Sequence, residues 1–495
     1  MANAPVVKLA LVAVSRDCFP IELSRARRDK LAAECKKLGL DPFVCPTIIE
    51  SEKDALKALD ECLKAGANAA VVYLGNFGPE GPLSIFAQRF HGPVMACAAA
   101  EESKDSLVQG RGDAYCGLLS ACYNLGLRNV RVYLPQLPFG LPEELAPQIA
   151  HFALVARAAL AVRKLKIVTF GPRPQDFFAC NAPIKPLYDL GVEVMENSEL
   201  DMYVLYQGVK EDDKDVAATA KDMAKELGAG SAYPDLLPKL ARFQVALERF
   251  AAANMGSRDY LVFANKCWPA FEQAFGFVPC YVNSRLSARG MPVACEVDIY
   301  GALSEYLCYL TSEQPATLLD INNTVPADMI ERGADLKGAA IEDLFMGFHC
   351  GNTPCECMKS CSLKYQLIMN RLMEPGQEPD ITRGTLEGQL RPGPAVFFRL
   401  QSSAEGKLSS YIAQGDILDI DPRSFGGIGI FAIPNFARFY RHVMLAKRFP
   451  HHGAVAFAGC GKALFDAVKL LGVDDVNTPL PRTVLYPGEN PFELA

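Results

Sequence analysis

Short apolar runs alternate with amphipathic segments along the first third of the chain. The strand-like runs are residues 6–14, 43–49, 69–74, 93–99 and 129–134, and the helix-like segments include residues 24–38 and 51–65. Gly39 and Gly66 directly follow these two segments, as glycine commonly does at the end of a helix. Ser51 and Asp54 form a pair typical of a helix N-terminus. This alternation predicts a parallel sheet covered by helices, in a doubly wound domain.

A second series of strands and helices begins at residues 165–170 and runs into the loop Gly171-Pro172-Arg173-Pro174. Its later elements are helix-like residues 212–227 and 237–253 and strand-like residues 260–264 and 316–321. After residue 341 the strand-like runs dominate, at residues 395–400, 408–420 and 428–433. We therefore expect an α/β fold with two doubly wound parallel-sheet domains, residues 1–163 and 164–325, followed by a mixed, β-rich C-terminal domain, residues 326–495.

Composition and charge exclude several classes of protein. Of the 495 residues, 50% are hydrophobic and 22% are charged, which is ordinary for a globular protein and argues against disorder or coiled coil. The net charge is −7 and no long block carries a single sign, so we expect no nucleic-acid partner. His151 and Arg157 interrupt the long apolar stretch 149–162, which falls short of the ~18 uncharged residues of a membrane span. We expect no membrane partner.

The N-terminus and the cysteines bear on the compartment. No basic segment and no small-residue cleavage site precede Arg16, so the sequence predicts no secretion signal. The chain has 17 cysteines, an odd number scattered along its length, which fits a reducing compartment better than a disulfide framework. We predict a cytoplasmic protein.

Four polar residues stand at the edges of apolar runs, where they could carry chemistry. Glu296 closes the run that starts at Met291, and Asp320 closes the run that starts at Ala316. His349 follows one apolar run, and His452 precedes another. Carboxylates at the ends of buried runs are costly unless they are paired, hydrogen-bonded or metal-bound. Taken singly, each residue could also be a helix cap or a core histidine.

Together these oxygen and nitrogen donors would suit a divalent ion such as Mn²⁺, Mg²⁺ or Co²⁺, because carboxylate-rich sites do not favour soft metals. Their spacing in the sequence does not by itself show that they converge.

Several motifs resemble those of the L-fucose/L-arabinose isomerase family, whose members interconvert aldoses and ketoses. They are Cys267-Trp268-Pro269, the stretch 293–299 around Glu296, Leu318-Leu319-Asp320 and His451-His452-Gly453. The interval between Glu296 and Asp320 is similar to that between the metal carboxylates of fucose isomerases. The resemblance implies that these two residues bind a metal ion and act as acid and base. It also implies that His452 and His349 are histidine ligands and that the ion is Mn²⁺ (or Co²⁺/Mg²⁺).

The resemblance further implies a homo-oligomer, a trimer or hexamer, with active sites between subunits. Arg16, at the end of the first strand, resembles an arginine that reaches the substrate of a neighbouring subunit, although it could equally be a surface arginine. Lys266 and Trp268 flank Cys267 of the motif and are further candidates for binding the small-molecule sugar.

The resemblance predicts isomerisation through a cis-enediol, in which a carboxylate moves a proton between adjacent carbons. A metal-mediated hydride shift would use the same ligands. The substrate is expected to be a deoxy sugar or pentose such as L-fucose, D-arabinose or L-arabinose. Lys447 and Arg448 precede the double histidine, so an anionic sugar, sulfonated or phosphorylated, is conceivable. Basic residues at a helix end are the commoner reason for such a pair.

Two other classes of function compete with this hypothesis. Tandem α/β domains also occur in non-catalytic sugar-binding or regulatory proteins, which normally carry a signal peptide or a DNA-binding segment. The cluster Cys350, Cys355, Cys357 and Cys361 could hold a soft metal or serve a redox function. Its spacing matches no standard zinc finger or ferredoxin pattern, and reduced thiols in a tight turn are the simpler explanation. The glycine-rich stretches lack phosphate-binding motifs, so we expect no nucleotide cofactor.

Overall fold

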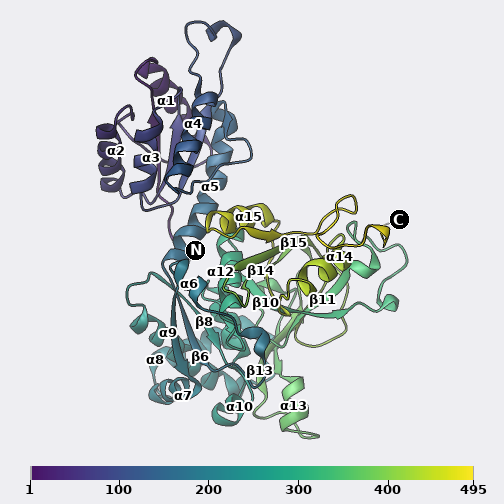
Figure 1. Ribbon diagram of the computed structural model, residues 1–495. Helices are drawn as coiled ribbons and strands as arrows, with labels where there is room; N and C mark the ends of the chain where they lie inside the picture. Colours follow the sequence, from purple (N-terminus) through teal and green to yellow (C-terminus); the bar gives the residue numbers. More distant parts are fainter. Residues whose placement is uncertain (1–2, 494–495) are drawn as a thin grey trace. The chain divides into compact units, whose positions relative to one another are not determined.

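The computed structural model describes residues 3–493 and divides into two compact units. One unit comprises Pro5–Leu160 and Asp466–Gly472. The other comprises Ala161–Phe465 together with residues 3–4 and 473–493. The first unit contains one sheet and the second contains two (Figure 1). Each unit has its own buried hydrophobic residues.

The first unit contains a parallel five-stranded sheet in the order β2-β1-β3-β4-β5. Its strands are β1 (Leu9–Val14), β2 (Phe43–Val44), β3 (Ala69–Leu74), β4 (Val94–Ala99) and β5 (Phe139–Gly140). Its helices are α1 (Ile21–Lys37), α2 (Glu52–Lys64), α3 (Glu80–Arg89), α4 (Ala114–Leu127) and α5 (Pro142–Arg163), the last of which continues past the border of the unit at Leu160. Every residue of β1, β3 and β4 is buried, as expected for a parallel sheet covered on both faces.

Two predicted strands of this unit are much shorter than the sequence pattern indicates. Residues 129–134 contain only a single bridge, from Tyr133 to Met95, and the edge strand is β5 instead. Likewise, residues 43–49 form only β2 and a bridge at Ile49. Proline explains both differences, because Pro46 and Pro135 lack the amide hydrogen that a sheet ladder requires.

The second unit opens with a parallel four-stranded sheet in the order β7-β6-β8-β9. Its strands are β6 (Leu165–Gly171), β7 (Glu193–Ser198), β8 (Tyr260–Asn265) and β9 (Val293–Cys295). The helices of this region are α6 (Lys185–Asp189), α7 (Glu199–Gly208), α8 (Lys214–Leu227), α9 (Leu237–Asn254), α10 (Ala270–Phe275), α11 (Cys280–Ala288) and α12 (Ile299–Ser312). Parallel strands end at the same edge of a sheet, so the residues after β6, β8 and β9 lie along one edge.

The same unit contains a nine-stranded mixed sheet in the order β12-β13-β16-β11-β10-β17-β14-β15-β18. Its strands are β10 (Ala316–Thr324), β11 (Leu344–His349), β12 (Ser362–Tyr365), β13 (Arg383–Gln389), β14 (Gly393–Ser402), β15 (Leu408–Leu418), β16 (Gly427–Ala432), β17 (His452–Ala456) and β18 (Asp475–Asn477). The helices are α13 (Leu367–Met373), α14 (Phe436–Phe439) and the first part of α15 (Gly461–Leu470), whose residues from Asp466 onward belong to the first unit. An additional pairing of β15 with β16 closes six of these strands into an antiparallel barrel.

The predicted fold class is confirmed, because two parallel sheets with helices are followed by a large mixed sheet. The strand β10 belongs to the mixed sheet, where it pairs with β11 and β17. The mixed sheet therefore extends across the predicted boundary between residues 325 and 326. The division into residues 1–163, 164–325 and 326–495 stays a prediction.

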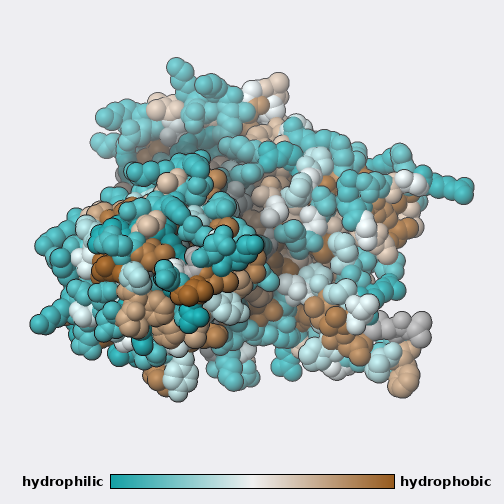
Figure 2. Space-filling model, turned by 90° about the horizontal axis from the view of Figure 1, so that it is seen from above, coloured by the Kyte–Doolittle hydropathy of each residue, from teal (hydrophilic) through white to brown (hydrophobic). Residues whose placement is uncertain are grey.

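Helix α5 is long and apolar enough to cross a membrane by length and composition alone. However, 56% of its most apolar window is buried inside the protein, and a core helix of a soluble protein meets the same criteria. Figure 2 shows one face of the molecule, on which hydrophobic residues form separate patches among hydrophilic ones. The absence of a membrane partner stays a prediction.

Gly453 in β17 provides a test of the barrel packing. A Cβ atom at this position would lie 2.1 Å from the ring of Phe397 and 2.5 Å from the hydroxyl of Tyr411. We expect Gly453→Ala to lower the free energy of unfolding by about 1–3 kcal/mol, measured by urea denaturation. Gly208→Ala in α7 is the control, because no atom lies within 4 Å of its added Cβ. Equal stability of the two variants would contradict the packing described here.

Candidate active site

Four predicted ligands meet where one end of the barrel faces the edge of the four-stranded sheet. Asp320 in β10 lies directly opposite His452 in β17. The Nε2 atom of His452 lies 3.3 Å from Oδ1 of Asp320 and 3.7 Å from Oε2 of Glu296. His349, the last residue of β11, has its ring centroid 6.0 Å from that of His452. The structure thus brings together Glu296, Asp320, His349 and His452, although their segments are far apart in the sequence.

A strained turn places Glu296. Strand β9 ends at Cys295, and both Glu296 and Val297 adopt a left-handed φ of 60° before α12 begins. A β-branched residue rarely adopts this conformation, and such strain is concentrated at functional sites. The indole Nε1 of Trp268 donates a hydrogen bond of 3.3 Å to Oε1 of Glu296. The turn and the indole together hold the Glu296 carboxylate against His452.

A buried ion pair fixes the orientation of His452. Its Nδ1 atom lies 2.9 Å from Oδ2 of Asp298, and Arg399 of β14 donates two hydrogen bonds to the same carboxylate, at 2.5 and 2.8 Å. All three side chains are 1% exposed. A carboxylate on one imidazole nitrogen sets the tautomer that leaves the other nitrogen free to bind a metal. Asp298 therefore presents Nε2 of His452 to Asp320 and Glu296.

The charges of the site shift several pKa values. Burial would lower the pKa of His452, but the hydrogen bond that its Nδ1–H donates to Asp298 and the charges of Asp320, Asp298 and Glu296 outweigh burial and raise this pKa. Burial raises the pKa of Glu296. Burial would also raise the pKa of Asp298, but Arg399 and His452 hold it well below its usual range. Burial and the neighbouring His452 lower the pKa of His451 to about 4, so this imidazole is neutral at neutral pH.

The cluster has the composition of a divalent metal site. His452 shares one group of closely spaced ligand atoms with Asp320 and His349, and a second with Glu296 and His451; each group lies within 4.8 Å. The Oδ1 atom of Asp320 is buried and accepts no hydrogen bond from the described residues. Carboxylate oxygens and imidazole nitrogens are the ligands that Mn²⁺ and similar ions prefer. The residues present can therefore hold such an ion.

A cavity of about 390 Å³ opens beside the cluster. Its acidic and histidine lining comprises Glu272, Glu296, Asp320, His349 and His451. Its remaining lining consists of Phe177, Cys267, Trp268, Val278, Cys280, Phe348, Cys350, Gln366, Ile368 and Met369. Among these described residues there is no lysine or arginine. The volume is within the range of small-molecule sites.

The other predicted substrate residues are placed differently. Trp268 lines the cavity, whereas the ammonium of Lys266 lies 2.7 Å from Glu199 and does not line it. Arg448 is exposed and also lies outside the lining. Arg16 belongs to the unit of Pro5–Leu160, where its guanidinium lies 4.8 Å above the ring of Phe77. The roles assigned to these residues from the sequence stay predictions.

Sequence reasoning assigned no role to Asp298, Arg399 or His451. A charged residue within the apolar run 395–400 was the available signal for Arg399, because a buried arginine requires a partner. Asp298 stands two residues after Glu296, but its role depends on the turn between them.

The cysteine cluster is not a four-thiol site. The expectation that all four thiols are reduced is wrong for two of them, because Cys355 and Cys361 form a disulfide, whereas Cys350 and Cys357 are free. The Sγ atom of Cys350 lies 3.5 Å from Nδ1 of His349. Within residues 3–493, no group of metal-ligating atoms comes from the segment 350–361 alone.

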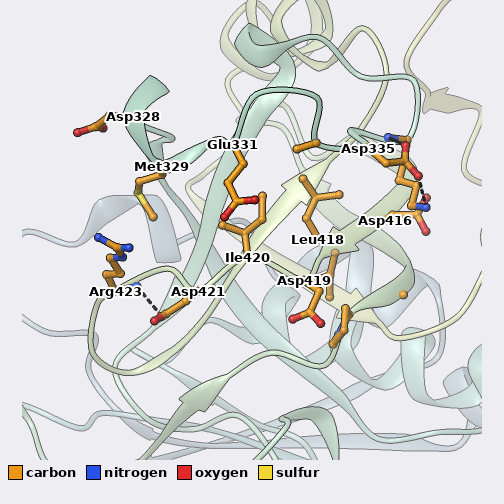
Figure 3. Close-up of a pocket in the computed structure, with 15 residues that line it drawn as sticks. Asp328, Met329, Glu331, Asp335, Asp416, Leu418, Asp419, Ile420, Asp421 and Arg423 are labelled. Atoms are coloured by element: carbon orange, nitrogen blue, oxygen red, sulfur yellow. Dashed lines mark hydrogen bonds and ion pairs between the residues drawn. The ribbon is translucent and has the colours of Figure 1, made fainter.

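A second, larger cavity of about 850 Å³ lies elsewhere in the same unit (Figure 3). Its acidic side chains are Asp328, Glu331, Asp335, Asp416, Asp419 and Asp421. Lys337 pairs with Asp335, and the backbone amide of Arg423 donates to Asp421. The described residues that line this cavity include no histidine or cysteine, so it lacks the imidazoles that accompany the carboxylates of the first cavity.

Three carboxylates and two imidazoles around one cavity are the acid–base groups that an enzyme active site contains. Comparison with known families agrees. Residues 10–163 match the family model described as fucose/sulfoquinovose isomerase, N-terminal domain. Residues 347–477 match the model described as L-fucose isomerase, C-terminal domain. The chain belongs to the L-fucose isomerase family.

Three relatives are each named sulfoquinovose isomerase. The protein from Alkalicoccus urumqiensis is 25% identical over 349 residues, which cover 68% of this chain and 70% of the relative. The protein from Priestia aryabhattai is 24% identical over 307 residues, which cover 60% of this chain and 65% of the relative. The protein from a Clostridium species is 25% identical over 305 residues, which cover 60% of this chain and 61% of the relative. The chain thus matches less than two thirds of the length of the latter two relatives.

Asp298→Asn tests how His452 is held. The amide keeps the size of the side chain but removes the charge that pairs with Arg399 and orients Nδ1. We expect the dissociation constant for Mn²⁺, measured by calorimetry, to rise about 10- to 100-fold. Asp222→Asn is a matched control, because Asp222 pairs with another buried arginine, Arg285, outside the cavity lining. An unchanged Mn²⁺ affinity in folded Asp298→Asn would show that this ion pair does not orient the ligand.

Proposed function

We propose that this protein is a metal-dependent aldose–ketose isomerase that acts on an anionic sugar such as a sulfonated aldose. The observation that carries the proposal is the convergence of Glu296 and Asp320 on one nitrogen of His452, beside a cavity of small-molecule size. Membership of the L-fucose isomerase family supports the reaction, and the names of the relatives support the substrate. Mn²⁺, or Co²⁺ or Mg²⁺, is the expected ion, and we keep a cytoplasmic location as a prediction.

A bound divalent ion would withdraw charge from neighbouring sugar oxygens and so favour loss of a proton from carbon. Glu296, Asp320, His349 and His452 would hold it. One of the two carboxylates takes the proton from carbon and returns it to the adjacent carbon, through a cis-enediol. Trp268 restrains Glu296 through its indole N–H, and Asp298 restrains His452. These contacts keep the acid–base groups in place during the transfer.

An anionic substrate requires a cation, and the described lining of the cavity has no lysine or arginine. We assign this function to Arg16 of a neighbouring subunit in a homo-oligomer, a trimer or hexamer. Such an arrangement would place each active site between subunits.

A second candidate substrate is a neutral sugar, such as L-fucose, L-arabinose or D-arabinose. One observation favours it: the wall of Val278, Phe348, Ile368 and Met369 is apolar and suits the methyl group of a deoxy sugar. Incubating the Mn²⁺-loaded protein with sulfoquinovose and these three sugars, followed by an assay for ketose, distinguishes the two.

Removal of metal and of either carboxylate should abolish isomerisation. We expect EDTA to remove activity and Mn²⁺, Co²⁺ or Mg²⁺ to restore it. Glu296→Gln and Asp320→Asn should each reduce kcat by about 10²–10⁴-fold, since each removes a proton acceptor and a negative ligand. Asp328→Asn, in the acidic cavity of Figure 3, is the control and should keep full activity. A folded variant at either site with the wild-type rate would refute the assignment.

Arg16→Gln should lower kcat/KM for sulfoquinovose by at least about tenfold while leaving metal affinity unchanged, because it removes only the anion's partner. Arg25→Gln, on α1 and paired with Glu22, is the matched control. Light scattering should show an oligomer under assay conditions. A fully active monomer would exclude both the oligomer and the role of Arg16.

A further inference from the structure

Glu272 is a buried carboxyl group in the wall of the cavity. It lies on α10 and is 1% exposed. Neither of its carboxyl oxygens has a hydrogen-bond partner among the other described residues. The same cavity is lined by Glu296 and Asp320. Glu272 is therefore an acid in the candidate active site for which the isomerisation mechanism provides no role.

No neighbouring cation offsets the cost of burying the Glu272 carboxyl group. The groups that influence its ionisation are its own backbone amide, the thiol of Cys350 and the carboxyl of Glu199, and no cation is among them. A buried polar group without a partner is costly, and proteins satisfy nearly all such groups. Glu272 is also absent from the groups of closely spaced metal-ligating atoms in residues 3–493. The position of Glu272 therefore does not indicate that it binds a metal ion.

A second buried glutamate in the same unit, Glu305, differs from Glu272 in its position relative to the cavity. Glu305 on α12 is also 1% exposed, and its Oε2 also has no hydrogen-bond partner among the described residues, although a hydrogen bond with Ser287 contributes to its environment. Glu305 does not line the cavity. Of these two buried acids, only Glu272 lines the cavity.

We propose that Glu272 binds a hydroxyl group of the sugar through its two carboxyl oxygens. This inference rests on the proposed function, and it adds a substrate-binding residue to the same site. A hydroxyl group both donates and accepts hydrogen bonds. Burial raises the pKa of Glu272 to about 8, so its carboxyl is mostly neutral at neutral pH and can also do both. A neutral acid holds a hydroxyl without adding a negative charge to the cavity that Glu296 also lines.

The position of Glu272 along the chain supports this role. It stands four residues after Trp268, which bonds to Glu296 and lines the same cavity. The segment 268–272 thus contributes two residues to one wall of the cavity. Trp268 restrains the carboxylate of Glu296, and Glu272 offers a polar group to the substrate. A hydroxyl bound there would align the sugar with Glu296.

The test compares Glu272→Leu and Glu272→Gln with Glu305→Gln as the control. The aldose isomerised best among sulfoquinovose, L-fucose, L-arabinose and D-arabinose is assayed beside its monodeoxy analogues. We expect Glu272→Leu to reduce kcat/KM for the parent sugar about tenfold, and Glu272→Gln to reduce it less. For the one analogue that lacks the hydroxyl group bound by Glu272, Glu272→Leu and the wild type should have the same kcat/KM. Glu305→Gln should behave as the wild type.

An unchanged kcat/KM of folded Glu272→Leu for the parent sugar would overturn the inference. The inference would also be overturned if Glu272→Leu lowered kcat/KM by the same factor for the parent sugar and for every analogue. The alditols of the four sugars give a second readout, because they bind without reacting. If the wild type isomerises none of the sugars but binds an alditol, the proposed function fails, and weaker binding by Glu272→Leu still supports the hydroxyl contact. If Glu272→Leu binds that alditol as tightly as the wild type, or if the wild type binds no alditol, the inference fails too.

Discussion

The ion pair between Asp298 and Arg399 is the interaction on which the site depends. It joins the segment after β9 to β14 of the barrel, and the same carboxylate orients His452 and accepts the amide hydrogen of Gly301 at the start of α12. A buried ion pair adds little to stability by itself, because desolvation offsets the attraction. Its contribution here is geometric, since it fixes two sheets and one imidazole relative to each other.

The candidate site combines two kinds of support. Glu296 follows a parallel strand and is held by a turn with two left-handed residues, whereas Asp320 and His452 face each other on adjacent barrel strands. The barrel residues are set by sheet register, in which a shift of one residue would turn a side chain to the other face. Glu296 is set by backbone strain and by the indole of Trp268. The metal-ligand geometry therefore depends on both.

Much of the fold was predictable because the strands buried on both faces are continuous apolar runs, as in β1 and β3. Prediction was wrong at the sheet edge, where prolines shorten strands that have few partners. Glu296, Asp320, His349 and His452 were recognisable because each ends or begins such a run. The contacts of Arg399 and Glu272 were not, because a role that depends on which segments meet in space leaves no periodic signal in the sequence.

The barrel closure between β15 and β16 has a consequence for how such a protein can evolve. The acid–base and ligand groups are distributed from Glu296 to His452, and the strands between them are needed to complete the ring. A recombination point inside this stretch separates ligands or ring strands from one another. Residues 296–456, up to the end of β17, are therefore expected to be inherited as one block, whereas exchange of the unit formed by Pro5–Leu160 leaves the ligand cluster intact.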